Sequence, residues 1–217
     1  ERAAPVLDLY EGKWNGRRLR ADEFVISADE KTSIQARIRL HPSVIRADGR
    51  GQRVEHEYER GGAWAYLAAW DVHRARVYGR LELENGIEPF SRLVEQVMTR
   101  EPYASAYRVF WIVDQGSSHH RSTFPGRLRS MFPNARAVHL PVHASWLNQI
   151  EIYFSVVDRK ALTPNDFPGL DAVRKRIHDF ARQFSAHARP FKWNFTRHDL
   201  RKLIDRIEGD HKYRDTG

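Results

Sequence analysis

Two stretches near the start of the chain, 23–28 (EFVISA) and 34–40 (IQARIRL), alternate between apolar and polar residues. A period of two is typical of half-buried β-strands, and we expect the two stretches to pair as antiparallel neighbours. Residues 46–62 are rich in Gly, Arg and Glu, and they indicate an exposed excursion before the next strand.

Two further alternating stretches, 63–72 and 76–83, are joined by a short polar segment and predict a β-hairpin. A different pattern occupies 107–113, where residues 110–113 form an unbroken apolar run. Such a run indicates a strand that is covered on both faces, as at the centre of a sheet. Asp114 follows this run directly, so we expect it where a buried strand reaches the surface.

Apolar residues three or four positions apart predict helices in the rest of the chain. The predicted helices lie at 87–98, around Phe124 to Phe132, around Ile150 to Val157, at 170–187 and at 197–207, with a short strand at 135–140. Antiparallel strands, a helix, a strand, a helix, a strand and then helices predict a mixed α/β sheet flanked by helices.

Charge and composition narrow the class of protein. The 217 residues suffice for one large domain with a substantial core. Lys and Arg number 36 against 28 Asp and Glu, and the pI of about 9.9 favours binding to a polyanion. The absence of cysteine excludes disulfides, zinc–thiolate sites and cysteine nucleophiles. The longest apolar stretch, 63–70, is too short to span a bilayer, and we expect a cytoplasmic protein without membrane contact.

Four carboxylates are candidates for a shared site. Asp29, Asp71 and Asp114 each end a predicted strand, and Glu151 lies in the first turn of a predicted helix. Carboxylates at one edge of a sheet suit Mg²⁺ or Mn²⁺, and two such ions can cleave a phosphodiester. Asn148 followed by Glu151 also fits a capping box, in which Glu151 would only start its helix. The residues alone leave open which three acids form a site.

Five longer segments carry a resemblance to a known family. They are VISADEKTSIQA (25–36), VEHEYERGGAWAYLAAWDVH (54–73), FWIVDQGSSHH (110–120), PVHASWLNQIEIYFSVVDRKALTPNDF (141–167) and RPFKWNFTRHDLRKLI (189–204). Together they resemble DDE transposases, and more narrowly the bacterial insertion-sequence branch of the mariner-like superfamily. The resemblance extends from about residue 6 to residue 207.

The resemblance implies a ribonuclease H-like fold, with a mixed five-stranded sheet flanked by helices and a metal-binding triad at the sheet edge. Matched by motif, the triad is Asp29 in SADEKT, Asp114 in VDQGSSH and Glu151 in WLNQIE. These acids would hold two Mg²⁺ ions, with Mn²⁺ as a substitute. Asp71 then becomes a structural residue of its hairpin.

Four residues near the triad are candidates for auxiliary roles: His119, His143, Gln115 and Lys31. His119 follows the second acid and His143 precedes the third, and either could contact the scissile phosphate or hydrogen-bond a carboxylate. Gln115 replaces an asparagine that many relatives carry. Lys31 is interpreted as a phosphate contact or a surface charge.

Three basic residues near the C-terminus are candidate contacts for DNA phosphates: Arg189, Lys192 and Arg197. Three alternating aromatic residues nearby are predicted to pack against the sheet: Phe191, Trp193 and Phe195. Thr196 with Asp199 fits a capping box for the last helix.

The function that the resemblance implies is that of a transposase catalytic domain, which cleaves DNA at transposon ends and joins the 3′-hydroxyl to target DNA. Its partners would be terminal inverted repeats and target DNA, bound by a homodimer. The alternatives are a ribonuclease H-like nuclease that only hydrolyses, and an inactive DNA-binding remnant. Residues 1–217 would form one catalytic domain, with a core at about 20–160, a helical part at about 161–217 and no N-terminal helix-turn-helix region.

Overall fold

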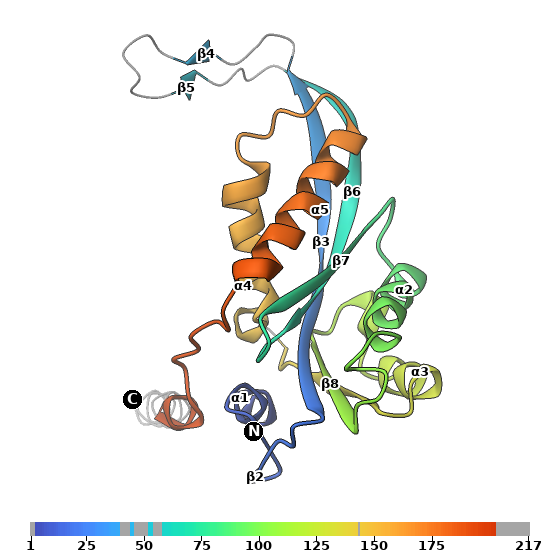
Figure 1. Cartoon of the computed structure of the whole chain (residues 1–217), viewed down its shortest axis with the longest axis vertical. Helices are drawn as coiled ribbons and strands as arrows, with labels where there is room; N and C mark the ends of the chain where they lie inside the picture. Colours follow the sequence, from blue (N-terminus) through green and yellow to red (C-terminus); the bar gives the residue numbers. More distant parts are fainter. Residues whose placement is uncertain (1–2, 40–43, 46–51, 54–57, 143, 203–217) are drawn as a thin grey trace, which may run out of the picture.

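A central sheet organises the computed structural model, which describes residues 3–39, 44–45, 52–53, 58–142 and 144–202 (Figure 1). Its five strands lie in the order β7-β6-β3-β8-β9. They are β3 Glu23–Arg39, β6 Tyr58–Asp71, β7 Arg76–Glu82, β8 Arg108–Val113 and β9 Ala135–His139. β6 is antiparallel to both β3 and β7, whereas β8 runs parallel to β3 and β9. The expected mixed five-stranded sheet is confirmed.

The longest strand, β3, has 17 residues, and the prediction of two antiparallel neighbours at 23–28 and 34–40 is wrong. Both halves belong to one strand and pair with β6. Shifts of register before and after Ile34 absorb the polar residues in between, and Ser33 takes a positive φ of 56°. Such bulges insert residues without ending the pairing. Asp29 therefore lies inside a long strand rather than at its end.

The hairpin predicted at 63–72 and 76–83 is confirmed as β6 and β7. β6 already begins at Tyr58, inside the segment predicted as an exposed excursion. Just before and within that region, β4 Val44–Ile45 pairs with β5 Gln52–Arg53. Residues 46–51 and 54–57 of the predicted excursion lie outside the described residues.

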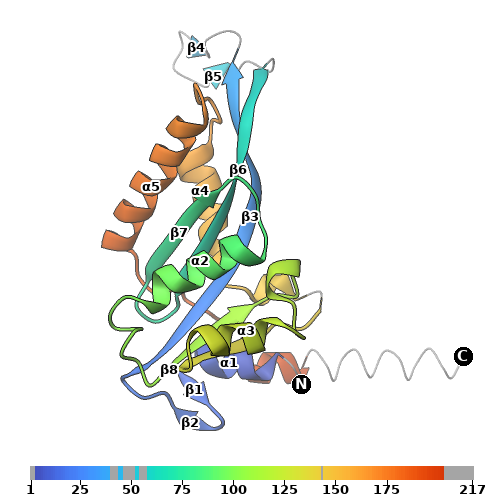
Figure 2. The ribbon, with the colours of Figure 1, turned by 90° about the vertical axis from the view of Figure 1, so that its right-hand side faces the viewer.

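Helices cover both faces of the sheet (Figures 1 and 2). One face carries α1 Ala4–Tyr10, α4 Ile150–Val157 and α5 Leu170–His187, and the other carries α2 Ile87–Met98 and α3 Phe124–Met131. Successive residues of β3 feed the two cores in turn, since Val25 is buried on the first face and Ile26 on the second. Among the described helices, none combines the length and the apolar character needed to cross a membrane.

A small hairpin precedes the sheet. β1 Lys13–Trp14 and β2 Arg17–Arg18 pair across Asn15 and Gly16, whose φ angles are 49° and 77°. Two positive φ angles are what a type I′ turn requires, and Asn-Gly is the dipeptide that favours it. The ring of Trp14 lies 4.7 Å from that of Phe110 and fixes the hairpin to the sheet. This element is missing from the sequence prediction.

The aromatic residues of the C-terminal segment pack inward, but only Phe191 packs on a strand of the sheet, whereas Trp193 packs on α1 and Phe195 on the turn before α4. Each lies 4.6–5.1 Å, between ring centroids, from another aromatic ring: Phe191 from Trp70, Trp193 from Tyr10 and Phe195 from Trp146. The predicted capping box is also present, because the N–H of Thr196 donates to Asp199 Oδ2 at 2.9 Å. Residues 197–202 are helical, and the rest of the helix predicted at 197–207 lies outside the described residues.

Asp71 anchors the β6–β7 hairpin. Its Oδ1 accepts the N–H groups of His73 and Arg74 at 3.2 and 3.0 Å, and its Oδ2 accepts the hydroxyl of Tyr103 at 2.6 Å. The side chain is fully buried, and this burial raises the pKa of the carboxyl in spite of the three bonds. Asp71 therefore ties the hairpin to the segment that follows α2.

We expect Tyr103→Phe to lower the free energy of unfolding by about 1–3 kcal/mol, because Asp71 Oδ2 would remain buried without its donor. Urea unfolding would measure the loss. Tyr107→Phe is the matched control, since Tyr107 is 52% exposed, and it should change the free energy by less than about 0.5 kcal/mol. Equal stability of Tyr103→Phe and the unchanged protein would contradict the anchoring role.

Candidate active site

Asp29 lies in β3, and Asp114 directly follows the last residue of the neighbouring parallel strand β8. The register of β3 with β8 sets Ser27 beside Ile112, and the residues two positions further along each chain are Asp29 and Asp114. Because side chains alternate with a period of two, Asp29 leaves the sheet on the face of Ser27. That face also carries α4, whose first turn contains Glu151. The side chain of Asp114 is placed by the loop after β8.

Asp29 is nearly buried, with 8% of its surface exposed. Its Oδ1 accepts the backbone N–H of Glu30 at 2.8 Å, and its Oδ2 accepts the amide of Asn148 at 3.0 Å. Burial, and then the charge of Asp114, raise the pKa of Asp29 to about 8. Ionising both carboxylates at once is therefore costly in the absence of a cation.

Asn148 holds Asp29 from the helix side of the sheet. Its fully buried amide donates to Asp29 and to the carbonyl of Ala28, at 3.0 and 3.3 Å. Its Oδ1 accepts the hydroxyl of Ser27 at 2.5 Å. The oxygen of Ser27 in turn accepts the N–H of Ile150 at 2.9 Å. This network fixes the start of α4 against β3.

The predicted capping box of Asn148 and Glu151 is wrong. The helix begins one residue later than expected, Gln149 takes the N-cap position, and no side chain caps the helix. The Asn148 side chain instead donates a hydrogen bond to Asp29, which lies 119 residues earlier in the sequence. A local sequence pattern carries no information about a contact of that range.

Asp114 is held by the loop that follows β8. Its Oδ1 accepts the N–H of Gly116 at 2.6 Å and contacts Nε2 of His119. The hydrogen bond from His119 lowers the pKa of Asp114. Burial opposes protonation of His119, but the bond to Asp114 and the charges of Glu30 and Asp29 outweigh it and raise the His119 pKa. His119 thus hydrogen-bonds a carboxylate, one of the two roles considered for it.

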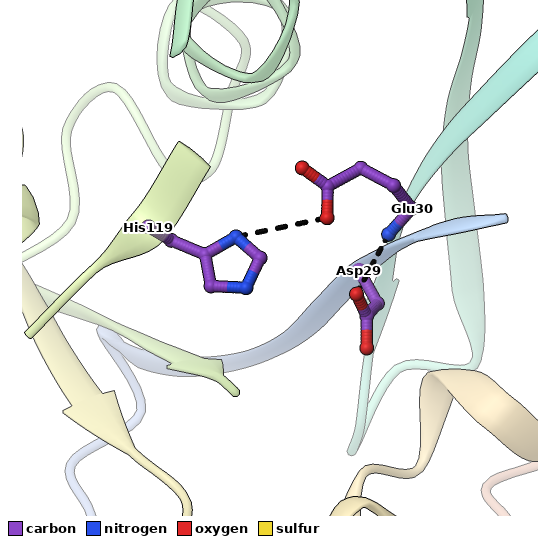
Figure 3. Close-up of side chains that lie close together, drawn as sticks. All are labelled: Asp29, Glu30 and His119. Atoms are coloured by element: carbon purple, nitrogen blue, oxygen red, sulfur yellow. Dashed lines mark hydrogen bonds and ion pairs between the residues drawn. The ribbon is translucent and has the colours of Figure 1, made fainter. Parts of the chain in front are cut away.

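Glu30 joins the cluster although it is not among the predicted site residues (Figure 3). Its Oε2 lies 3.7 Å from Nδ1 of His119, and its Oε1 accepts the hydroxyl of Ser118. One potential ligand atom from each of Asp29, Glu30 and His119 lies within 4.8 Å of the others. The sequence signal was weak, because alternation places Glu30 on the face of β3 opposite to Asp29. The buried ring of His119 connects Glu30 to the cluster, because its Nδ1 faces Glu30 and its Nε2 contacts Asp114.

Glu151 lies at the exposed side of the cluster. Partial burial of its carboxyl, followed by the charges of Asp114 and Asp158, raises the pKa of Glu151, while the ammonium of Lys31 opposes the rise. Asp114 therefore interacts electrostatically with both Asp29 and Glu151. Lys31 lies at the same edge and pairs with Asp158 at 2.8 Å.

Gln115 contacts none of the acids through the hydrogen bond that the structure shows for it. The amide of Gln115 donates to the carbonyl of Leu140 at 3.1 Å and so links the ends of β8 and β9. His143 lies outside the described residues.

The three C-terminal candidates for DNA contact differ in their surroundings. Arg189 and Lys192 are exposed on the segment after α5. Arg197 is exposed but pairs with Asp8 of α1 at 3.0 Å, so it also holds the C-terminal segment against the N-terminal helix.

The donors of the cluster fit a hard divalent cation. Asp29, Asp114 and Glu151 offer carboxylate oxygens, which Mg²⁺ and Mn²⁺ prefer. A cation would offset the burial and the repulsion that raise the Asp29 pKa and would displace its proton. Among the described residues, the group with potential ligand atoms within 4.8 Å of one another is Asp29, Glu30 and His119, and the ligand set with Glu151 stays a prediction.

The order and direction of the strands, with helices on both faces, define a ribonuclease H-like fold, as the resemblance implied. The chain belongs to the DDE superfamily endonuclease family, whose sequence model matches residues 25–174. Asp29, Asp114 and Glu151 all lie within that range. The narrower assignment to the bacterial insertion-sequence branch stays a prediction.

Solved structures of the Mos1 mariner transposase share this fold. A Mos1 mariner paired-end complex with Mn aligns with a TM-score of 0.53 and 15% identity, over 74% of this chain and 50% of that chain. A Mos1 paired-end complex with the left transposon end aligns with a TM-score of 0.53 and 16% identity, over 74% of this chain and 49% of that chain. The chain therefore spans about half the length of these Mos1 chains, and at such identities the likeness establishes the fold. No curated protein sequence matches the chain.

The raised pKa of Asp29 predicts a stability that falls as the pH rises. The folded protein keeps this proton until about pH 8, whereas the unfolded chain loses it near pH ~4. The contribution to stability is therefore complete below about pH 4 and lost as the pH rises through about 8. Thermal unfolding in EDTA should show this decline, and the decline should be smaller in Asp29→Asn, which has no proton to lose.

Asp71→Asn measures a second contribution of the same sign, since burial also raises the pKa of Asp71, and the decline in the unchanged protein should exceed that in either variant. Profiles of Asp29→Asn and the unchanged protein that are parallel throughout this pH range would contradict the raised pKa.

Proposed function

We propose that this chain is the catalytic domain of a DNA transposase, which cleaves DNA strands at the ends of a mobile element and joins them to target DNA. The observation that carries the proposal is the register of β3 with β8, which sets Asp29 beside Asp114 at the end of β8, with Glu151 in the first turn of the helix that covers the Asp29 face of the sheet. Membership of the DDE superfamily endonuclease family supports it. So does the shared fold with Mos1 structures that contain paired transposon ends.

Asp29, Asp114 and Glu151 would hold two Mg²⁺ or Mn²⁺ ions. When bound, such ions supply an activated oxygen nucleophile and stabilise the leaving oxygen of an in-line displacement. The chain's own groups fix the geometry: Asn148 orients Asp29, and His119 with the Gly116 N–H orients Asp114. Lys31, at the Glu151 edge, is a candidate to contact a DNA phosphate.

The proposed reaction has two displacements at phosphorus. In the first, the oxygen of water bonds to the phosphorus and the bond to the 3′-oxygen breaks, which leaves a 3′-hydroxyl and a 5′-phosphate. In the second, that 3′-oxygen bonds to a target phosphorus and displaces the target 3′-oxygen, so one phosphodiester replaces another. No oxidant or external energy source is needed. Two element ends must be held together for this outcome, which favours a homodimer in the active complex.

The test is cleavage and joining of DNA by conservative variants of the triad. Asp29→Asn, Asp114→Asn and Glu151→Gln each remove one negative charge while keeping the shape, and each should lower Mg²⁺-dependent cleavage by at least ~100-fold. Asp71→Asn removes the same charge from a structural site and should leave cleavage close to normal at a temperature where it remains folded. Chelation by EDTA should stop the reaction.

The outcomes separate the proposal from its alternatives. Cleavage that persists in EDTA would refute the role of the metal ions. Hydrolysis without joining would identify a nuclease that only hydrolyses. DNA binding without cleavage by the unchanged protein would identify an inactive remnant. A normal rate in Glu151→Gln together with an inactive Asp71→Asn would mean that Asp71, not Glu151, belongs to the site.

We expect Asn148→Ala to weaken Mg²⁺ affinity by about 10- to 100-fold, because the carboxylate of Asp29 would lose the amide that orients it. Isothermal titration calorimetry would measure the affinity. Asn134→Ala is the matched control: its amide also makes two hydrogen bonds to backbone carbonyls, those of Tyr103 and Ala106, but away from the acids. Equal losses of Mg²⁺ affinity in both variants would assign Asn148 a general structural role only.

A further inference from the structure

An open, positively charged hollow lies at the end of β3 and β8 opposite to the acidic cluster. Its volume is about 580 Å³, and it is lined by the β1–β2 hairpin and by the first residues of the two strands. Because β8 runs from Arg108 to Val113, just before Asp114, the hollow lies about 20 Å from the acids. We call it the arginine hollow; it is lined by Trp14, Asn15, Arg17, Arg18, Arg20, Glu23, Tyr107 and Arg108. Four of these residues are arginines, and the one carboxylate, that of Glu23, pairs with Arg108 at 3.6 Å.

The hairpin presents two of these arginines on a fixed support. The tight turn and the packing of Trp14 on Phe110 hold β2 in place, and the N–H of Leu19 donates to the carbonyl of Gly12 at 2.8 Å. Arg17 and Arg18 are exposed, and no carboxylate in the described part of the chain forms an ion pair with either. Their charges are available to an external anion.

The remaining arginines cover the aromatic residue of the hollow. The guanidinium carbons of Arg20 and Arg108 lie 4.1 and 5.2 Å from the ring centroid of Tyr107. Arg20 is also held by Asp22 through two bonds of 2.8 and 2.9 Å. A nucleic-acid base that stacked on Tyr107 would have to displace a guanidinium. The geometry therefore favours contact with phosphates. It disfavours stacking of bases on aromatic rings, which is the usual way in which proteins bind single strands.

The positive charge continues beyond the hollow. Burial, and then the charges of Arg129 and Arg108, lower the pKa of Arg136 on β9. Arg136 lies beside Phe110 of β8, so arginines from β2, β8 and β9 lie at the same end of the sheet. Like charges gathered in this way repel one another until an anion neutralises them. Their spread over three elements exceeds what one phosphate group can contact.

We propose that the arginine hollow binds the phosphate backbone of duplex DNA, away from the strand position that is cleaved. Guanidinium groups match phosphate oxygens through paired hydrogen bonds, and backbone contacts fix position without reading sequence. The identification of the polyanion as DNA rests on the proposed function. At 3.4 Å for each base pair, the distance to the acids corresponds to about six base pairs of duplex.

The test is the affinity of the full chain for a fluorescein-labelled duplex of arbitrary sequence, measured by anisotropy in EDTA. Arg17→Gln with Arg18→Gln should weaken binding on the order of tenfold and reduce the slope of log affinity against log salt by about two. Lys175→Gln with Arg182→Gln is the matched control, because it removes the same charge from exposed positions on α5. The control should bind like the unchanged protein.

Circular dichroism would establish that both double variants remain folded. Equal weakening by the two pairs would mean that only net charge matters, and it would overturn the proposal, as would unchanged affinity of the hairpin variant. Tighter binding of a single strand than of the duplex would also overturn it. Binding is measured in EDTA and cleavage in Mg²⁺, so the two results are independent. A protein that binds the duplex through the hairpin but does not cleave DNA would refute the proposed function and leave this proposal standing.

Discussion

The parallel pairing of β3 with β8 places the carboxylates of Asp29 and Asp114 close together at a position where Asp29 is buried. Burial makes it costly for both to be charged. Asp29 lies on the face of β3 that α4 covers, and burial together with the charge of Asp114 raises its pKa. The surrounding groups partly offset this repulsion. Asn148 donates to Asp29, and His119 contacts Asp114 through Nε2 and faces Glu30 through Nδ1. The cluster is therefore arranged to receive positive charge.

The third acid depends on segments from both ends of the chain. The turn before α4, Ser145–Leu147, is held by Tyr10 of α1, whose hydroxyl donates to the Leu147 carbonyl at 2.6 Å and accepts the N–H of Gln149 at 3.3 Å. Trp193 packs on the Tyr10 ring. The position of Glu151 thus follows from packing between the first helix and the C-terminal segment. Aromatic residues far from the acids in sequence therefore help to position the helix that carries Glu151.

Much of this arrangement could be predicted from the sequence, because apolar periodicity reports burial directly. The run before Asp114 predicted a central strand, and helical spacing located α2 and α5. Local patterns failed where tertiary contacts decide. A polar stretch that looks like a turn is absorbed by bulges in β3, and the apparent cap at Asn148 serves a strand 119 residues away. The two-residue strands β1 and β2 are too short to show a period, so only the Asn-Gly turn marked them. Glu30 was missed because a strand neighbour is expected to face away.

Under the two proposals, the arginines at the start of β3 and β8 and the acids near the end of β8 act on DNA separately. Interactions between exposed charges are screened over about 8–10 Å in physiological salt, whereas the arginine hollow and the acids are about 20 Å apart along β8. Under the two proposals, a duplex held by the arginines would stay bound whether or not cations occupy the acidic cluster. Repulsion by unneutralised Asp29 and Asp114 would disturb only the phosphates nearest to them. The length of one buried strand thereby separates the holding of DNA from its chemistry, which a single mixed cluster of arginines and acids could not do, because the arginines would pair with the acids instead.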